Sequence, residues 1–107
     1  MTIEYIDSLE AMEKLTRKEP YVIVNFSGDN CYGCELLDPV YREVSFDLPG
    51  LIFAELDPGS APDAMEKLGI NAMPTLVYFR QGQEIKRTVG SMSRQDLLEA
   101  VAELLYE

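Results

Sequence analysis

The fold is decided by one segment, YVIVNFSGDNCYGC at residues 21–34. Its first six residues, 21–26, are β-branched and aromatic without clean alternation, which is typical of a strand covered on both faces. Turn-forming residues at 27–30 end this strand. Apolar residues at helical spacing then follow, namely Leu37, Val40, Tyr41 and Val44. Cys31 and Cys34 are therefore predicted to open a helix directly after a central strand.

The rest of the chain alternates between strand and helix patterns. The predicted elements are an edge strand at 2–6, a helix after Asp7 or Ser8 that ends before Glu19-Pro20, strands at 51–56, 75–79 and 84–89, a helix at 61–68 closed by Gly69, a hairpin turn at Gln81-Gly82, and a final helix capped by Ser93. Pro39 should bend the second helix. The pattern predicts one α/β domain, residues 1–107, whose reactive groups lie beyond the carboxyl ends of the strands.

Composition narrows the function classes. The chain has 107 residues, of which 47% are hydrophobic and 26% charged, the balance of a globular domain. A net charge of −10 disfavours nucleic acid and anionic membranes as partners and favours basic proteins. The chain shows neither a membrane-spanning run nor a basic leader, so we expect a cytoplasmic protein. We also expect the protein to be a monomer.

The absence of histidine bears on the role of the cysteines. It excludes a histidine-assisted cysteine hydrolase and disfavours zinc, and two cysteines alone cannot complete a four-ligand site. A disulfide across so short a loop would restrict the unfolded chain little. We therefore predict no metal and no cofactor other than the cysteine pair, which is either a redox pair or two small buried residues.

The predicted position of the pair favours redox chemistry. A thiolate at a helix N-terminus meets unpaired N–H groups and the positive end of the macrodipole, which makes Cys31 the candidate nucleophile. Cys34, one turn further, would attack a mixed disulfide on Cys31 and expel the substrate thiol. Met73-Pro74 directly precedes a buried strand, where a cis bond would present the Met73 backbone to an extended substrate segment. The alternative is an ordinary proline that leads a strand.

Taken together, these features resemble the thioredoxin family over almost the whole chain. The matching features are the strand before the cysteines, Cys31-x-x-Cys34, Pro39, Met73-Pro74-Thr75, the Gly82 hairpin and Val89-Gly90. The resemblance implies the thioredoxin fold, with a central mixed five-stranded sheet flanked by four helices, and reduction of protein disulfides. It also implies a cis Pro74 beside the disulfide, a Gly90 that admits substrate backbone, and a thioredoxin-reductase-type electron donor.

The motif departs from the familiar family pattern in two places. Asn30 stands where tryptophan is usual, and Tyr32-Gly33 replaces Gly-Pro. Tyr32 should supply the aromatic contact to substrate, and Gly33 should loosen the first helical turn. Asn25 and Glu55 occupy the positions of the buried aspartate and lysine that family members use for proton transfer. We predict Glu55 as the base for Cys34 and Asn25 as its orienting residue; a hydrogen-bonded pair with no catalytic duty is the alternative.

Acidic residues surround the reactive sulfur. Asp29 and Glu35 flank the motif and Asp38 lies one turn on, so partners with Lys or Arg near the target disulfide should be preferred. A merely solvated acidic helix start is the alternative. At the level of function, two further hypotheses are a dedicated electron donor to one partner, which would reduce insulin poorly, and a non-catalytic interaction module with incidental thiols.

Overall fold

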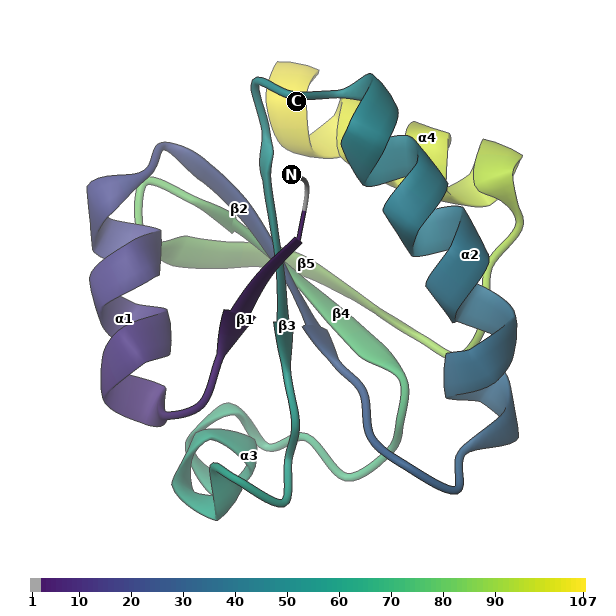
Figure 1. The fold of residues 1–107 in the computed structure, drawn as a ribbon. Coiled ribbons are helices and arrows are strands. Elements are labelled where there is room, and N and C mark those ends of the chain that lie inside the picture. The colour runs from purple at the N-terminus through teal and green to yellow at the C-terminus, as the bar shows by residue number, and fades with distance from the viewer. Residues whose placement is uncertain (1–2) are drawn as a thin grey trace.

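A computed structural model describes residues 3–107. The element order is β1 (Ile3–Ile6), α1 (Leu9–Lys18), β2 (Tyr21–Phe26), α2 (Tyr32–Asp47), β3 (Ile52–Leu56), α3 (Pro62–Leu68), β4 (Thr75–Arg80), β5 (Gln83–Val89) and α4 (Arg94–Tyr106) (Figure 1). These bounds agree with the predicted elements to within one or two residues. Thr2, the first residue of the predicted edge strand, lies outside the described residues.

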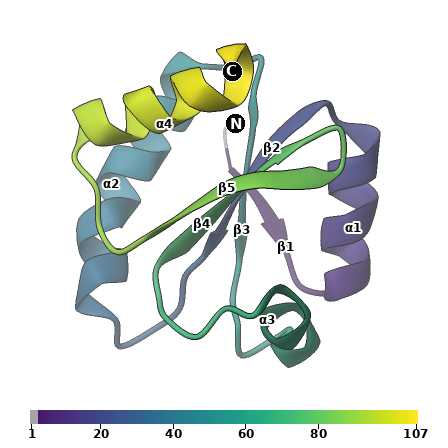
Figure 2. The ribbon, with the colours of Figure 1, turned by 180° about the vertical axis from the view of Figure 1, so that it is seen from behind.

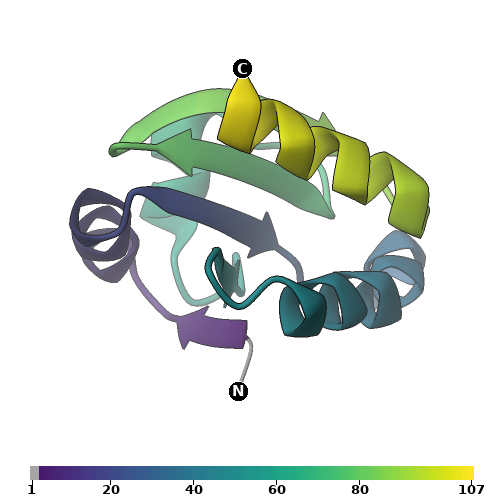
Figure 3. The same ribbon diagram turned by 90° about the horizontal axis from the view of Figure 1, so that it is seen from above.

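The sheet has five strands in the order β1-β3-β2-β4-β5. The first three of these run parallel, β4 is antiparallel to β2, and β5 is antiparallel to β4. Figure 3 shows the strands one after another across the sheet, with β1 (purple) at one edge and β5 (light green) at the other. β2 is thus central, as its continuous apolar pattern predicted. The mixed five-stranded sheet with four helices confirms the predicted fold class.

Two helices cover each face of the sheet. α2 and α4 lie on one side, and α1 and α3 on the other (Figures 1 and 2). The α2 face holds a core that includes Ile23, Leu37, Tyr41 and Leu104. The opposite core lies between the sheet and the other two helices. Because alternate residues of a strand point to opposite faces, β2 supplies side chains to both cores.

Helix ends follow the local sequence rules. The Ser8 side chain accepts a hydrogen bond from the Ala11 N–H and the Ser93 side chain accepts one from the Asp96 N–H, so both serines are N-caps. Gly69 closes α3 with a positive φ of 67°, a conformation that glycine adopts without steric cost. α2 continues through Pro39 as one helix. No helix within residues 3–107 is long and apolar enough to cross a membrane.

Leu37 and Leu36 form a matched pair that tests the α2 core. The Leu37 side chain is fully buried, whereas its neighbour is 47% exposed. We expect Leu37→Ala to lower the free energy of unfolding by about 2 to 5 kcal/mol, because the substitution leaves a cavity under α2. Leu36→Ala should change it by about 0.5 kcal/mol or less. Urea unfolding of both oxidised variants measures the difference, and equal losses would contradict this packing.

Candidate functional site

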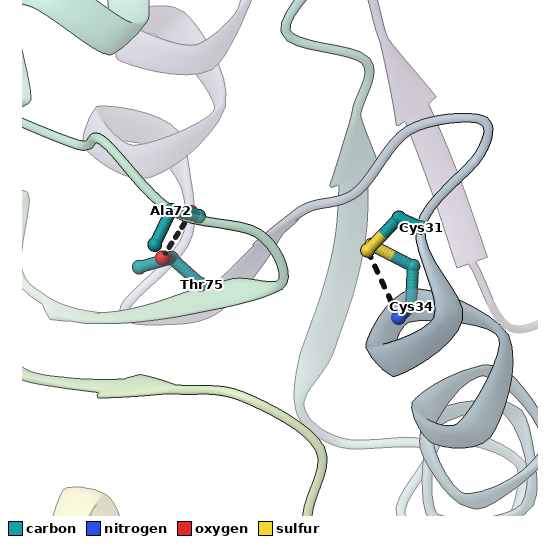
Figure 4. The surroundings of a disulfide bond; sticks show 4 residues. All are labelled: Cys31, Cys34, Ala72 and Thr75. Carbon is teal, nitrogen blue, oxygen red and sulfur yellow. Dashed lines mark hydrogen bonds between the residues drawn. A yellow bond between two sulfur atoms is a disulfide. The ribbon is translucent and has the colours of Figure 1, made fainter.

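The two cysteines lie at the start of α2, directly after the turn that follows the central strand β2. Cys31 is the N-cap of the helix, with an extended backbone, and it forms a disulfide with Cys34 across a Cα–Cα distance of 5.2 Å (Figure 4). The backbone N–H of Cys34 donates a hydrogen bond of 3.1 Å to the Cys31 Sγ. Cys31 is partly exposed, but Cys34 is only 4% exposed. The first cysteine is thus partly open to solvent and the second is covered.

Backbone geometry before Cys31 suits the residue found there. Asn30 has a positive φ of 54°, in the left-handed region. Asparagine tolerates this conformation better than most side chains, and a bulky residue would be strained in it. Asn30 therefore adapts the turn that leads from β2 into the helix.

The segment before β4 contacts the cysteine motif. The Met73–Pro74 peptide bond is cis, as the resemblance implied. The Thr75 Oγ1 donates a hydrogen bond of 2.7 Å to the Ala72 carbonyl oxygen and so closes the turn around the proline (Figure 4). A Cβ placed on Gly33 would lie only 3.1 Å from the Pro74 Cδ. The missing side chain at position 33 is therefore what lets this proline approach the disulfide turn.

Further predicted substrate-contact residues lie around this proline. The Gly90 N–H donates a hydrogen bond of 2.8 Å to the Pro74 carbonyl oxygen, and a Cβ on Gly90 would meet no atom within 4 Å. Met73 is 39% exposed, and its Sδ lies 3.4 Å from where a Cβ on Gly28 would stand. Tyr32 is 76% exposed. Met73 and Tyr32 are thus exposed, Gly90 is half-buried with open space beside its backbone, and Pro74 itself is buried.

Asn25 and Glu55 are direct neighbours on β2 and β3, which pair in parallel register. Glu55 and Cys34 line one open cleft of about 420 Å³. The other residues that line it are Ser27, Gly28, Asp29, Glu35, Asp38 and Asp57. Asn25 is 1% exposed, and its Oδ1 has no hydrogen-bond partner among the described residues. The Asn25 Oδ1 therefore makes no hydrogen bond to Glu55, which the alternative of a purely structural hydrogen-bonded pair would have allowed.

The surroundings of Glu55 favour its protonated form. Burial raises the pKa of this half-buried carboxyl above its ordinary value, and the negative charges of Asp38 and Asp57 raise it further. The positive charge of Arg42 acts in the opposite direction. Within residues 3–107 no three histidine, cysteine or acidic side chains are placed to hold a metal ion. The cleft therefore combines a carboxyl that titrates above its usual range with a buried sulfur.

Three residues of this region were not predicted from the sequence to belong to the site. Asp57 lines the cleft from the turn after β3, while Arg42 and Tyr5 contact each other beside it. The spacing Cys34, Asp38, Arg42 places these residues at four-residue steps along α2, which was a usable signal. Tyr5 carried no such signal, because its position opposite Glu55 follows from the register between β1 and β3.

Comparisons with known proteins agree with this architecture and site. The thioredoxin family model matches residues 5–103. A thioredoxin of Chlamydia muridarum is 31% identical over 81 residues, which cover 76% of this chain and 79% of that protein. A thioredoxin of Mycobacterium bovis is 30% identical over 105 residues, covering 97% and 90% of the two chains. The matched residues of the family model include the cysteine motif and the strands around it.

Solved structures share the fold at lower sequence identity. Plasmodium falciparum thioredoxin superposes with a TM-score of 0.87 at 22% identity, over 97% of this chain and 99% of that one. A mutant thioredoxin from Halobacterium salinarum gives 0.88 at 21% identity, over 96% and 90%. These likenesses establish the fold, and the family match adds the chemistry of the paired cysteines. The chain belongs to the thioredoxin family and is a thiol–disulfide oxidoreductase.

Proposed function

We propose that Cys31 attacks protein disulfides and that Cys34 resolves the mixed disulfide. The observation that carries this assignment is the asymmetry of the pair: Cys31 is partly exposed and its sulfur accepts a hydrogen bond from the Cys34 N–H, whereas Cys34 is buried. A hydrogen bond at a helix N-terminus stabilises the Cys31 thiolate after reduction. That thiolate bonds to one substrate sulfur and releases the other as a thiolate. The Cys34 thiolate then attacks Cys31, which frees the second substrate thiolate and leaves both enzyme cysteines oxidised.

The substrate surface we infer consists of Tyr32, Gly33, Met73, Pro74 and Gly90. An extended substrate segment would pair with the Met73 backbone, in the manner of a strand added to an edge. The open backbone at Gly90 leaves room for that segment. The exposed Tyr32 ring would supply apolar contact beside the target disulfide. This surface takes the place of the tryptophan-based one of familiar thioredoxins.

Glu55 is proposed as the proton acceptor for Cys34. Both groups line the same cleft, and a carboxyl whose pKa is raised by burial accepts a proton more readily than an ordinary one near neutral pH. After accepting the proton, Glu55 can donate a hydrogen bond to the unpartnered Oδ1 of Asn25 on the neighbouring strand. Asn25 would thus orient the protonated acid without titrating itself.

The proposed partners follow from this chemistry. They are oxidised proteins as substrates and a thioredoxin-reductase-type donor that restores the dithiol. The protein itself is proposed to be a monomer with one domain, residues 1–107. A cytoplasmic location suits a pair that must be kept reduced. The four carboxylates beside Cys34 and Glu55 in the cleft, Asp29, Glu35, Asp38 and Asp57, favour partners that carry Lys or Arg near the target disulfide.

Trapping separates the roles of the two cysteines. We expect Cys34→Ser to accumulate mixed disulfides with partner proteins, because Cys31 still attacks and nothing resolves the product. Cys31→Ser, the matched control, should trap at least tenfold less, since its remaining thiol is buried. Non-reducing gels with and without dithiothreitol measure the adducts. Equal trapping by the two variants would reverse or remove the assignment.

Glu55→Gln tests the proton acceptor. Mixing the reduced protein with 5,5′-dithiobis(2-nitrobenzoate) forms a mixed disulfide at Cys31, and resolution by Cys34 then releases a second coloured thiolate. Resolution in the parent should slow as the pH falls through the raised pKa of Glu55, because the protonated acid accepts no proton. Glu55→Gln should resolve the mixed disulfide several-fold more slowly near neutral pH. Its rate should also no longer show the fall toward low pH that the parent shows. Glu35→Gln controls for the loss of one cleft charge; a parent-like profile in Glu55→Gln would rule out the base.

Charge reversal at Glu35 tests the preference for basic partners. At low ionic strength, Glu35→Lys should reduce a disulfide peptide flanked by lysines several-fold more slowly than the parent does, because attraction becomes repulsion. The difference should vanish near 1 M salt, where the Debye length is about 3 Å. Glu99→Lys on α4 carries the same change in net charge away from the cleft. Identical rates for the two variants at low salt would leave the acidic residues as a solvated surface only.

A further inference from the structure

Arg42 makes two directed contacts beside the cleft. Its Nε donates a hydrogen bond of 2.9 Å to the Asp38 Oδ2, and its Nη2 donates one of 2.7 Å to the Tyr5 hydroxyl oxygen. The guanidinium carbon also lies 6.0 Å from the centroid of the Tyr5 ring. The planar fork of arginine is suited to holding two partners at once, which the single ammonium of lysine does less well. The guanidinium is therefore held between β1 and α2.

This bridge spans the position of Glu55. Tyr5 on β1 pairs in register with Glu55 on β3, which in turn pairs with Asn25 on β2. Paired residues point to the same face of a sheet, so Tyr5 is the neighbour of Glu55 on the face that α2 covers. Asp38, the other partner of Arg42, lines the cleft together with Glu55. Both anchors of the guanidinium are thus neighbours of this carboxyl.

The charges around Glu55 are unbalanced without Arg42. The groups that face it are Tyr5 from β1, Asp29 after β2, Cys34, Glu35, Asp38, Tyr41 and Arg42 from α2, and Asp57 after β3. Four of these are carboxylates, and Arg42 is the cation of this set. Asp38 and Asp57 oppose ionisation of Glu55, and Arg42 favours it.

The ion pair between Arg42 and Asp38 contributes little to stability. The side chains of Arg42 and Asp38 are 48% and 44% exposed, and exposed ion pairs contribute only about 0 to 1 kcal/mol to folding. An electrostatic effect on a half-buried neighbour is screened less than one between two exposed charges. The charge of Arg42 therefore acts on Glu55 even though its ion pair with Asp38 adds little to the stability of the fold.

We propose that Arg42 is a positioning residue for the redox reaction: held by Tyr5 and Asp38, its guanidinium keeps Glu55 ionised and able to accept the proton of Cys34. This role rests on the proposed function of Glu55 as base. The hydrogen bonds that the Arg42 guanidinium makes go to Asp38 and Tyr5, so its effect on Cys34 is transmitted through Glu55. Its removal should leave Cys31 attack in place and shift only the pH range in which Cys34 resolves.

The test is a titration of Glu55 in the reduced protein by carbon NMR of its side-chain carboxyl, at low salt. In Arg42→Gln the midpoint should rise by about 0.5 to 1 pH unit, because one nearby positive charge is lost. The acidic limb of the resolution rate should move upward by the same amount. Arg42→Lys keeps the charge and should give a midpoint between those of the parent and the glutamine variant.

Arg94→Gln is the matched control. Arg94 also pairs with α2, through Glu43 and Asp47, neither of which lines the cleft. Arg94→Gln should leave the titration midpoint of Glu55 at the parent value. A midpoint in Arg42→Gln that moves no more than in this control overturns the positioning role, and slow resolution in Glu55→Gln would show that the base survives that failure. If the midpoint moves but Glu55→Gln resolves at the parent rate, the proposed base fails, and the positioning role fails with it.

Discussion

The site depends on the pairing of β2 along both of its edges. The strand pairs with β3 on one side and β4 on the other, and helices cover both faces. Its backbone polar groups are therefore satisfied inside the sheet, and its end at Phe26 is held in place. Because β4 begins at the same edge, with Thr75 opposite Phe26, the proline that precedes β4 is brought to the turn that carries Cys31. The positions of the disulfide and of the proline are thus both fixed at the end of the sheet where β2 ends and β4 begins.

Much of this arrangement could be predicted from sequence. The apolar run of β2, the serine caps of α1 and α4 and the proline before β4 each follow a local rule with a physical cause. The placement of both cysteines at the start of a helix also followed from the turn residues and the helical spacing beside them. These predictions succeeded because the determining contacts lie within a few residues along the chain.

The remainder depends on strand order, which no local pattern specifies. Tyr5, Glu55 and Asn25 become neighbours only because β1 and β2 flank β3, although the chain separates them by tens of residues. Asp57 joined the cleft for the same reason. In familiar thioredoxins an acid on the second strand pairs with a lysine on the third. Here the acid is on the third strand, and the structure offers a cation from α2 beside it.

The contact between Gly33 and Pro74 limits how this motif can change. Any side chain at position 33 would bring a carbon to about 3.1 Å from the proline ring, closer than ordinary van der Waals distance, so the ring would have to retreat by a few tenths of an ångström. Replacing Gly33 by proline, as in the familiar Gly-Pro version of the motif, would therefore require a small displacement of the Pro74 ring. The residue at position 33 and the loop ahead of β4 are therefore in steric contact, so a change in the size of one acts directly on the other.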